Sequence, residues 1–212
     1  MSVATQDRSD TLHRILMAAE VEFAQRGFEG AGMKAISRRA EVSQALLHYH
    51  YGTKDHLYSE VVRTRAQVIN AEREAMLDVI DLQDARALEQ ILAALFFPPL
   101  GPAGGDAAYA RIFGGMVVGR ERERALVREF YDPTARCFIA ALQHIFPSCA
   151  PRIAALAYTF ALGALVAVIG RDGRVDRLVG NTPADDDDML SEALIEFTSA
   201  GIRGLVATQK PD

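Results

Sequence analysis

Cysteine is scarce in this sequence, and the familiar motifs of catalysis and metal binding are missing from it. Its two cysteines, Cys137 and Cys149, form no CxxC pair and predict buried thiols rather than a disulfide framework. No nucleophile elbow, phosphate-binding loop, paired-acid motif or metal-ligand cluster occurs. The aspartate run at 185–188 lacks the spacing, glycine and distal glutamate of an EF-hand loop. We therefore expect no cofactor, no metal and no enzyme; isolated Cys137 and His144 leave an unrecognised enzyme as an alternative.

Long β-type alternation and internal repeats are also missing, and so is the pattern of a secretory leader. Met1 to Asp10 is polar and has no apolar core, so we expect no signal peptide and a cytoplasmic location. Helical spacing runs through the chain instead, and 50% of its residues are hydrophobic, enough for a sizeable core. The predicted fold class is all-α.

Proline and glycine divide the second part of the chain into predicted helices. We expect breaks at Pro98-Pro99, Gly104-Gly105, Pro133 and Pro147. The predicted helices are 84–97, 106–118, 120–131, 134–146, 151–170 and 188–207. Residues 153–170 carry no charge, and a segment of this length raises the alternative of a membrane-spanning helix. Tyr158, Thr159 and Gly163 lower the hydrophobicity of that segment. They favour a helix that is buried on both sides within the protein.

One short stretch near the N-terminus, Val42 to Lys54, carries no acidic residue. Leucines 46 and 47 and Tyr51 share one face of a short helix, which leaves a polar set free to face outward. That set is Gln44, His48, Tyr49 and Lys54. Glutamine reads an adenine edge, and the other groups bond phosphate oxygens, so this helix suits DNA.

The preceding segment completes a two-helix motif. Met33 to Ala40 has the spacing of a two-turn helix, and Glu41-Val42-Ser43 is a tight connection. Ser43 is placed to cap the next helix, because its hydroxyl accepts an unpaired backbone N–H. Two short helices joined in this way predict a helix-turn-helix.

A longer helix is expected on each side of this motif. Ser9 to Arg26 has helical apolar spacing, and Gly27 is placed to stop it. A second long helix starts at Lys54-Asp55 and reaches about Leu77.

The order and spacing of these residues resemble the TetR family of transcriptional regulators over residues 9 to 68. The matching motifs are Ile15-Leu16-x-Ala18-Ala19, Phe23-Ala24, Gly27-Phe28, Met33-x-x-Ile36, Ala40-x-Val42-Ser43 and Leu47-His48-Tyr49-His50-Tyr51-x-x-Lys54-x-x-Leu57. The resemblance implies a three-helix DNA-binding head at 9–68 on a larger helical effector and dimerisation body at 69–212. Glu41 stands where the family commonly has glycine, so a positive φ is expected there, at a cost on the order of 1 kcal/mol.

The resemblance also implies which side chains meet DNA. Gln44 and Ala45 match positions that reach base edges, and Tyr49, His50 and Lys54 match phosphate contacts. The complete predicted interface is Lys34, Ser43, Gln44, Ala45, His48, Tyr49, His50 and Lys54.

Charge is distributed as a DNA-binding head on an acidic body would require. The formal net charge is −5. Residues 1–65 carry 9 Lys+Arg and 8 Asp+Glu, whereas residues 66–212 carry 14 and 20. An acidic body lowers non-specific attraction to DNA. Arginine and glutamate alternate from Arg120 to Arg124, which predicts an exposed charged face more than an anion site.

The body is expected to hold an effector pocket and a dimer interface. Aromatic and sulfur side chains, with one arginine for an acidic group, are the pocket candidates: Tyr109, Phe113, Met116, Arg120, Phe138 and Tyr158. The resemblance implies that the last two long helices pair with their copies in a homodimer. The candidates for that interface are Ala157, Ala161, Ala164, Phe197, Gly201 and Leu205.

These observations predict a regulator, most simply a repressor, that binds a palindromic double-stranded DNA operator as a dimer. A small molecule in the body would release it. The remaining alternative is a helical interaction module whose head no longer binds DNA.

Overall fold

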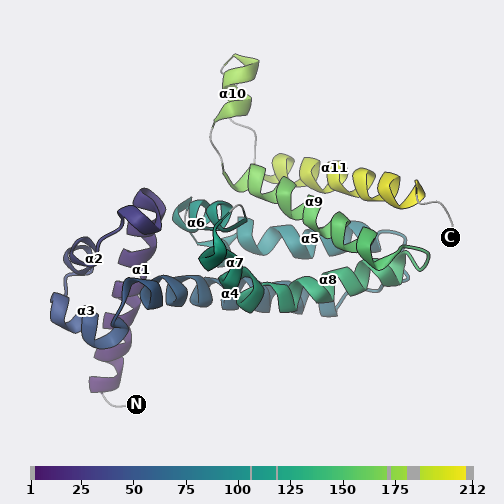
Figure 1. The fold of residues 1–212 in the computed structure, drawn as a ribbon. Helices are drawn as coiled ribbons and strands as arrows, with labels where there is room; N and C mark the ends of the chain where they lie inside the picture. The colour runs from purple at the N-terminus through teal and green to yellow at the C-terminus, as the bar shows by residue number, and fades with distance from the viewer. Residues whose placement is uncertain (1–2, 106, 118, 171–172, 181–186, 209–212) are drawn as a thin grey trace. The chain divides into compact units, whose positions relative to one another are not determined.

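The computed structural model describes residues 3–105, 107–117, 119–170, 173–180 and 187–208, and every regular element in those ranges is helical (Figure 1). The all-α prediction is confirmed. By contacts the chain forms two compact units. The first unit is residues 1–67 with 105–130, and the second unit is residues 68–104 with 131–212.

The first unit contains the expected helix-turn-helix. α1 (Val3–Gly30) leaves helical geometry at Gly27, where φ is 64°, so the predicted stop appears as a kink followed by one short turn. α2 (Met33–Arg39) and α3 (Gln44–Tyr51) follow. α4 (Lys54–Asp78) is the long helix expected to start at Lys54-Asp55. The Ser43 hydroxyl accepts the Leu46 N–H at 3.1 Å, which confirms the predicted cap.

The turn between α2 and α3 depends on a left-handed residue. Glu41 has φ 56° and is the one described residue other than glycine with a positive φ. The Val42 N–H donates to the Ser37 carbonyl at 3.0 Å and the Glu41 N–H to the Arg38 carbonyl at 3.3 Å. This pair of bonds is a Schellman motif, whose left-handed position glycine usually fills.

Two helices from the middle of the sequence also belong to the first unit. α6 (Ala107–Val117) packs along α1, and α7 (Glu121–Phe130) packs on α6. Tyr109, Ile112 and Met116 of α6 are buried. The expected domains, 9–68 and 69–212, are a division by function, which these contacts do not test. The contacts differ from it in placing residues 105–130 with the N-terminal segment, because α6 buries its apolar face there.

The second unit is a helical bundle, and the last part of α4, residues 68–78, belongs to it. It contains α5 (Ala87–Leu100), the short 3-10 helix η1 (Pro102–Gly104), α8 (Asp132–Ile145), α9 (Pro151–Ile169), α10 (Arg174–Val179) and α11 (Asp187–Ala207). α5 contacts α8, α9 and α11, and α9 contacts α8 and α11. The hydrophobic core of this second unit includes Leu92, Phe96, Phe138, Ala161 and Leu165. α10 was not among the predicted helices. Residues 185 and 186 of the aspartate run lie outside the described residues.

The predicted break at Pro98-Pro99 is wrong, because both prolines lie inside α5, which runs to Leu100. A proline at 99 removes the N–H that would bond the Leu95 carbonyl. That carbonyl instead accepts the Nε–H of buried Arg73 at 3.0 Å. A distant side chain thus replaces a bond within the helix, and local sequence does not reveal it.

Two burial predictions also need correction. Cys149 is buried as expected, but Cys137 is exposed on α8. α9 was expected to be buried on both sides, yet burial is confined to one face with Ala154, Ala157, Ala161 and Leu165, and Phe160 is 61% exposed. Within the described ranges α9 is also the one helix long and apolar enough to cross a bilayer. Helices in the cores of soluble proteins pass the same test, and α9 packs against three others.

The left-handed turn gives a stability prediction. Replacing Glu41 with glycine removes the roughly 1–2 kcal/mol that a side chain costs in this conformation. The greater freedom of glycine in the unfolded chain offsets roughly 0.5–1 kcal/mol of that gain. We expect Glu41→Gly to raise the free energy of unfolding by about 0.5–1 kcal/mol, or Tm by about 1–4 °C. Glu41→Gln removes the charge but keeps the strained φ, and serves as the control in thermal denaturation. A glycine variant no more stable than the glutamine variant would show that the turn is not strained.

Candidate nucleic-acid interface

α3 presents a polar face because two side chains anchor its other face. Leu47 and Tyr51 are buried, and the pKa of the Tyr51 phenol is raised, mainly by burial. Gln44, Ala45, His48 and Tyr49 are exposed, and Tyr49 is 78% exposed. A tyrosine this exposed contributes little to the core. The outward orientation expected for Gln44, His48 and Tyr49 is confirmed.

The ends of α3 are held by two of the predicted interface residues themselves. Ser43 accepts a backbone N–H at the start of the helix, and its own O–H stays available to donate to a phosphate. At the other end, His48 Nδ1 lies 2.9 Å from the Gly52 carbonyl oxygen. Because a carbonyl only accepts, Nδ1 carries the proton. Nε2 then donates to a phosphate only when the imidazole is a cation.

Charge around the two helices favours an anionic partner. From residue 33 to residue 51 the only acidic side chain is Glu41. Lys34 is exposed in the first turn of α2, and Arg38 is exposed near its end. His50 is partly buried, with its ring 5.0 Å from that of Tyr49. The α2–α3 surface is therefore basic although the chain as a whole is acidic.

Lys54 is less free than expected. Its Nζ donates to the carbonyls of Glu29 at 3.3 Å and Ala31 at 3.1 Å, and it lies 4.5 Å from the centroid of the Phe28 ring. The side chain is half-buried. Lys54 begins α4 beside the end of α1, where backbone carbonyls lack donors within the helix. An ammonium has three N–H groups, so one stays available to a phosphate.

The alternating charged segment contains an inward residue that sequence reasoning missed. Glu121 lies outward and pairs with Arg124 and Arg128. Arg122 instead pairs with Glu29, Asp55 and Glu123 and lies over the Phe28 ring. Alternation gives every arginine of such a run the same local pattern, so nothing in the sequence distinguishes Arg122.

The six effector-pocket candidates divide between the two units. Tyr109, Phe113 and Met116 are buried on α6 in the first unit. Phe138 is buried in the second unit, where its ring centroid lies 6.3 Å from that of Tyr158. The pKa of the Tyr158 phenol is raised, mainly by burial. Arg120 is exposed between α6 and α7. That these six line one pocket stays a prediction.

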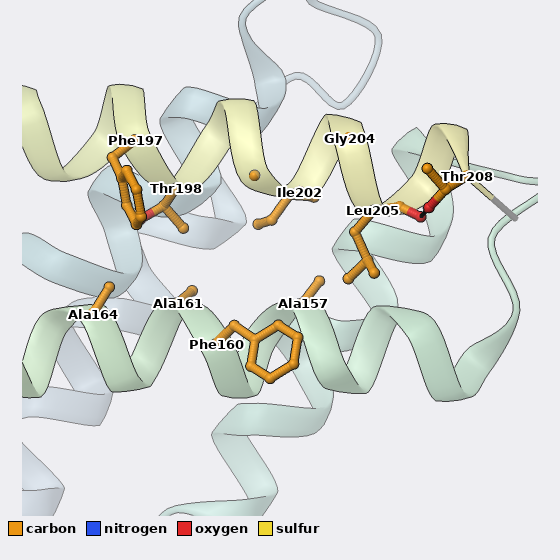
Figure 2. A pocket seen from close by; sticks show the side chains of 11 residues that line it. Ala157, Phe160, Ala161, Ala164, Phe197, Thr198, Ile202, Gly204, Leu205 and Thr208 are labelled. Carbon is orange, nitrogen blue, oxygen red and sulfur yellow. Dashed lines mark hydrogen bonds between the residues drawn. The ribbon is translucent and has the colours of Figure 1, made fainter.

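The six dimer-interface candidates do come together. All line an open groove of about 570 Å³ between α9 and α11 in the second unit. Figure 2 shows alanines of α9 facing Phe197 and Leu205 of α11 across it. Thr198 and Thr208 are the only lining residues with side-chain hydroxyls. Phe160 and Phe197, which are 61% and 74% exposed, also line the groove. The surface is apolar, and among the residues that the structure describes it is open.

Two curated regulators resemble part of the chain. A segment of 75 residues is 32% identical to the HTH-type transcriptional activator FasR of Mycolicibacterium smegmatis. A segment of 95 residues is 30% identical to the HTH-type transcriptional repressor NicS of Pseudomonas putida. The matches cover 35% and 44% of this chain and 34% and 44% of the two regulators. The chain therefore spans less than half the length of the curated relatives it matches.

The fold extends the likeness to most of the chain. The crystal structure of the transcriptional regulator FadR from Bacillus subtilis, in complex with stearoyl-CoA, superposes with a TM-score of 0.68 at 15% identity. The match covers 90% of this chain and 98% of that one. At this identity the likeness establishes the fold alone.

The chain matches two protein-family models, one after the other along the sequence. Residues 15–61, which hold α2, α3 and the Ser43 cap, match the bacterial regulatory proteins of the tetR family. Residues 93–201, just over half of the chain, match the tetracyclin repressor-like C-terminal domain. With its capped helix-turn-helix and this helical C-terminal part, the protein belongs to the TetR family of transcriptional regulators.

Proposed function

We propose that this protein is a cytoplasmic, homodimeric repressor that binds an inverted-repeat operator through α3 and is released by a small molecule. The observation that carries the proposal is the exposed, acid-free face of α3 on a capped helix-turn-helix. Gln44 and Ala45 stand in the first turn of α3, where a reading helix contacts base edges. An amide pairs with adenine N6 and N7, and a methyl group contacts that of thymine.

The backbone contacts are assigned to the side chains around this face. Ser43, Tyr49 and Lys34 are exposed donors, and His48 donates from Nε2 when it is a cation. Lys54 keeps one N–H beyond its two carbonyl partners. Such contacts fix the register of a protein on DNA without reading sequence.

A second copy of the chain is the occupant proposed for the α9–α11 groove. A groove lined by alanine and glycine allows close helix approach, and its exposed phenylalanines are the side chains that anchor interfaces. A two-fold dimer uses the same face on both copies. It would also cover the second apolar side of α9.

The proposed effector is a small and largely apolar molecule, and Phe138 and Tyr158, whose ring centroids lie 6.3 Å apart, are its candidate contacts in the second unit. Residues 105–130 fold with the first unit but join the second unit at both ends. A ligand that moves those ends changes the strain on the DNA-binding unit. A metabolite that raises Tm must then weaken DNA binding, and DNA must weaken the metabolite by the same factor. A stabilising metabolite that leaves DNA affinity unchanged is not the effector.

The direct test is selection of binding sites by the full-length protein from a pool of random duplexes, followed by footprinting. We expect an inverted repeat with half-sites about one helical turn, ~34–36 Å, apart. Protection of a single asymmetric site by a monomer would contradict the proposal. A protein that retains no duplex would instead be an interaction module with an inactive head.

Two substitutions separate base reading from backbone contact. Gln44→Ala should relax the preference at one base position by ~1–3 kcal/mol. Lys34→Ala should weaken binding to all duplexes equally. It should also reduce the slope of log affinity against log salt concentration by ~0.9, because one fewer counterion is released. Fluorescence anisotropy on the selected duplex and on single-base variants measures both effects. Gln67→Ala is the control, since Gln67 bonds Arg63 on α4 rather than lying on α3. Unchanged selectivity in Gln44→Ala would remove α3 as the reading helix.

The dimer is tested by placing a charge in the groove. Phe197→Asp should weaken self-association by about 30-fold or more, the loss of ~2 kcal/mol expected for an aromatic anchor. Val79→Asp makes a similar change at an exposed apolar residue outside the groove and should leave the dimer intact. Sedimentation equilibrium gives both constants. A wild-type chain that stays monomeric would leave the groove to a small apolar ligand.

A further inference from the structure

Arg122, the second residue of α7, binds three carboxylates and an aromatic ring at once. Its guanidinium carbon lies 3.4 Å from the centroid of the Phe28 ring. Its nitrogens lie 3.1 Å from a carboxylate oxygen of Asp55, 3.1 Å from Glu123 and 3.5 Å from Glu29. Asp55 belongs to the first turn of α4, and Glu29 to the last turn of α1. One side chain therefore joins three helices of the first unit.

The Arg122 cluster shares two residues with the surroundings of Lys54, the lysine assigned to a DNA phosphate. Lys54 lies over the same Phe28 ring as Arg122, at 4.5 Å. It precedes Asp55 in sequence, and its Nζ donates to the backbone carbonyl of Glu29. Both residues that carry these carboxylates are thus neighbours of Lys54, and their side chains are largely exposed, Glu29 at 73% and Asp55 at 68%.

Exposed carboxylates at this place oppose the binding of an anion. Each would repel a phosphate approaching Lys54, and charges within one Debye length, ~10 Å at 0.1 M salt, are only partly screened. Arg122 places a positive charge between the two. Arg124 and Arg128 pair with Glu121 instead, so they do not serve this purpose.

The Phe28 ring keeps this cluster in place. Its centroid lies 6.1 Å from that of Phe23 and 5.3 Å from that of Tyr58, both of which are buried. Burial, with Glu123 nearby, raises the pKa of the Tyr58 phenol to about 12, so the ring cluster stays neutral. A ring fixed in this way offers a rigid face to both cations.

We propose that Arg122 is a positioning residue for DNA binding, which neutralises Glu29 and Asp55 beside Lys54 so that a phosphate can approach. The proposal rests on the proposed DNA contact of Lys54. It assigns to α7, a helix outside the helix-turn-helix, a direct electrostatic effect on DNA affinity.

The test measures the affinity of the full-length protein for the duplex selected from the random pool, at several salt concentrations. Arg122→Gln should weaken binding by about 3- to 10-fold at low salt, and the loss should shrink as salt screens the carboxylates. Arg122→Lys keeps the charge and should recover most of the affinity. Arg124→Ala removes an arginine of the same helix and should change affinity less than twofold.

Removing the carboxylates distinguishes electrostatics from a purely structural role. The triple variant Arg122→Gln, Glu29→Gln, Asp55→Asn should bind at least as tightly as the wild type. Glu29→Gln with Asp55→Asn alone should bind more tightly, and this pair tests the proposal even where Arg122→Gln does not fold. If Arg122 merely fastened α7, the triple variant would bind as weakly as Arg122→Gln, and the paired variant would gain nothing. Either result overturns the inference, and so does wild-type affinity in Arg122→Gln. A wild-type chain that binds no duplex overturns the proposed function itself, and this inference with it.

Discussion

An eight-residue helix cannot hold its own conformation in water, and this constraint governs the DNA-binding surface. α3 exists because Leu47 and Tyr51 are buried beneath it, the Ser43 hydroxyl caps its start and the His48 ring bonds the backbone at its end. The face left over is free to be polar. Every side chain assigned to bases thus depends on contacts made by its neighbours on the other side of the same helix.

Sequence reasoning succeeded where a feature is decided within a few residues. The Ser43 cap, the interruption of the first helix at Gly27, predicted as its end, and the positive φ of Glu41 each follow from the local requirements of one turn. It failed where a distant group decides. Arg73 bonds the Leu95 carbonyl, so α5 continues through two prolines that would otherwise end it. The sequence predicted a helix at 106–118 but not that α1 would cover its apolar face.

The candidate sites also differ in whether nearby residues or distant groups decide their contacts. The outward residues of α3 were predictable, because helical periodicity assigns side chains to faces. The six candidates that line the α9–α11 groove came from the family resemblance, which implied that these two helices pair with their copies. The contacts of Lys54 and Arg122 were not, because they depend on where three helices meet around the Phe28 ring. Charged side chains with long stems reach many partners, and only the fold selects among them.

The path of the chain limits how modular this regulator is. The polypeptide passes from one unit to the other within α4, again before α6 and again after α7. A fragment that ends after α4 would lack α6 and would leave the apolar face of α1 exposed to water. A hybrid regulator built from this DNA-binding unit must therefore take residues 105–130 along with the N-terminal segment. The interchangeable part of this protein is discontinuous in sequence.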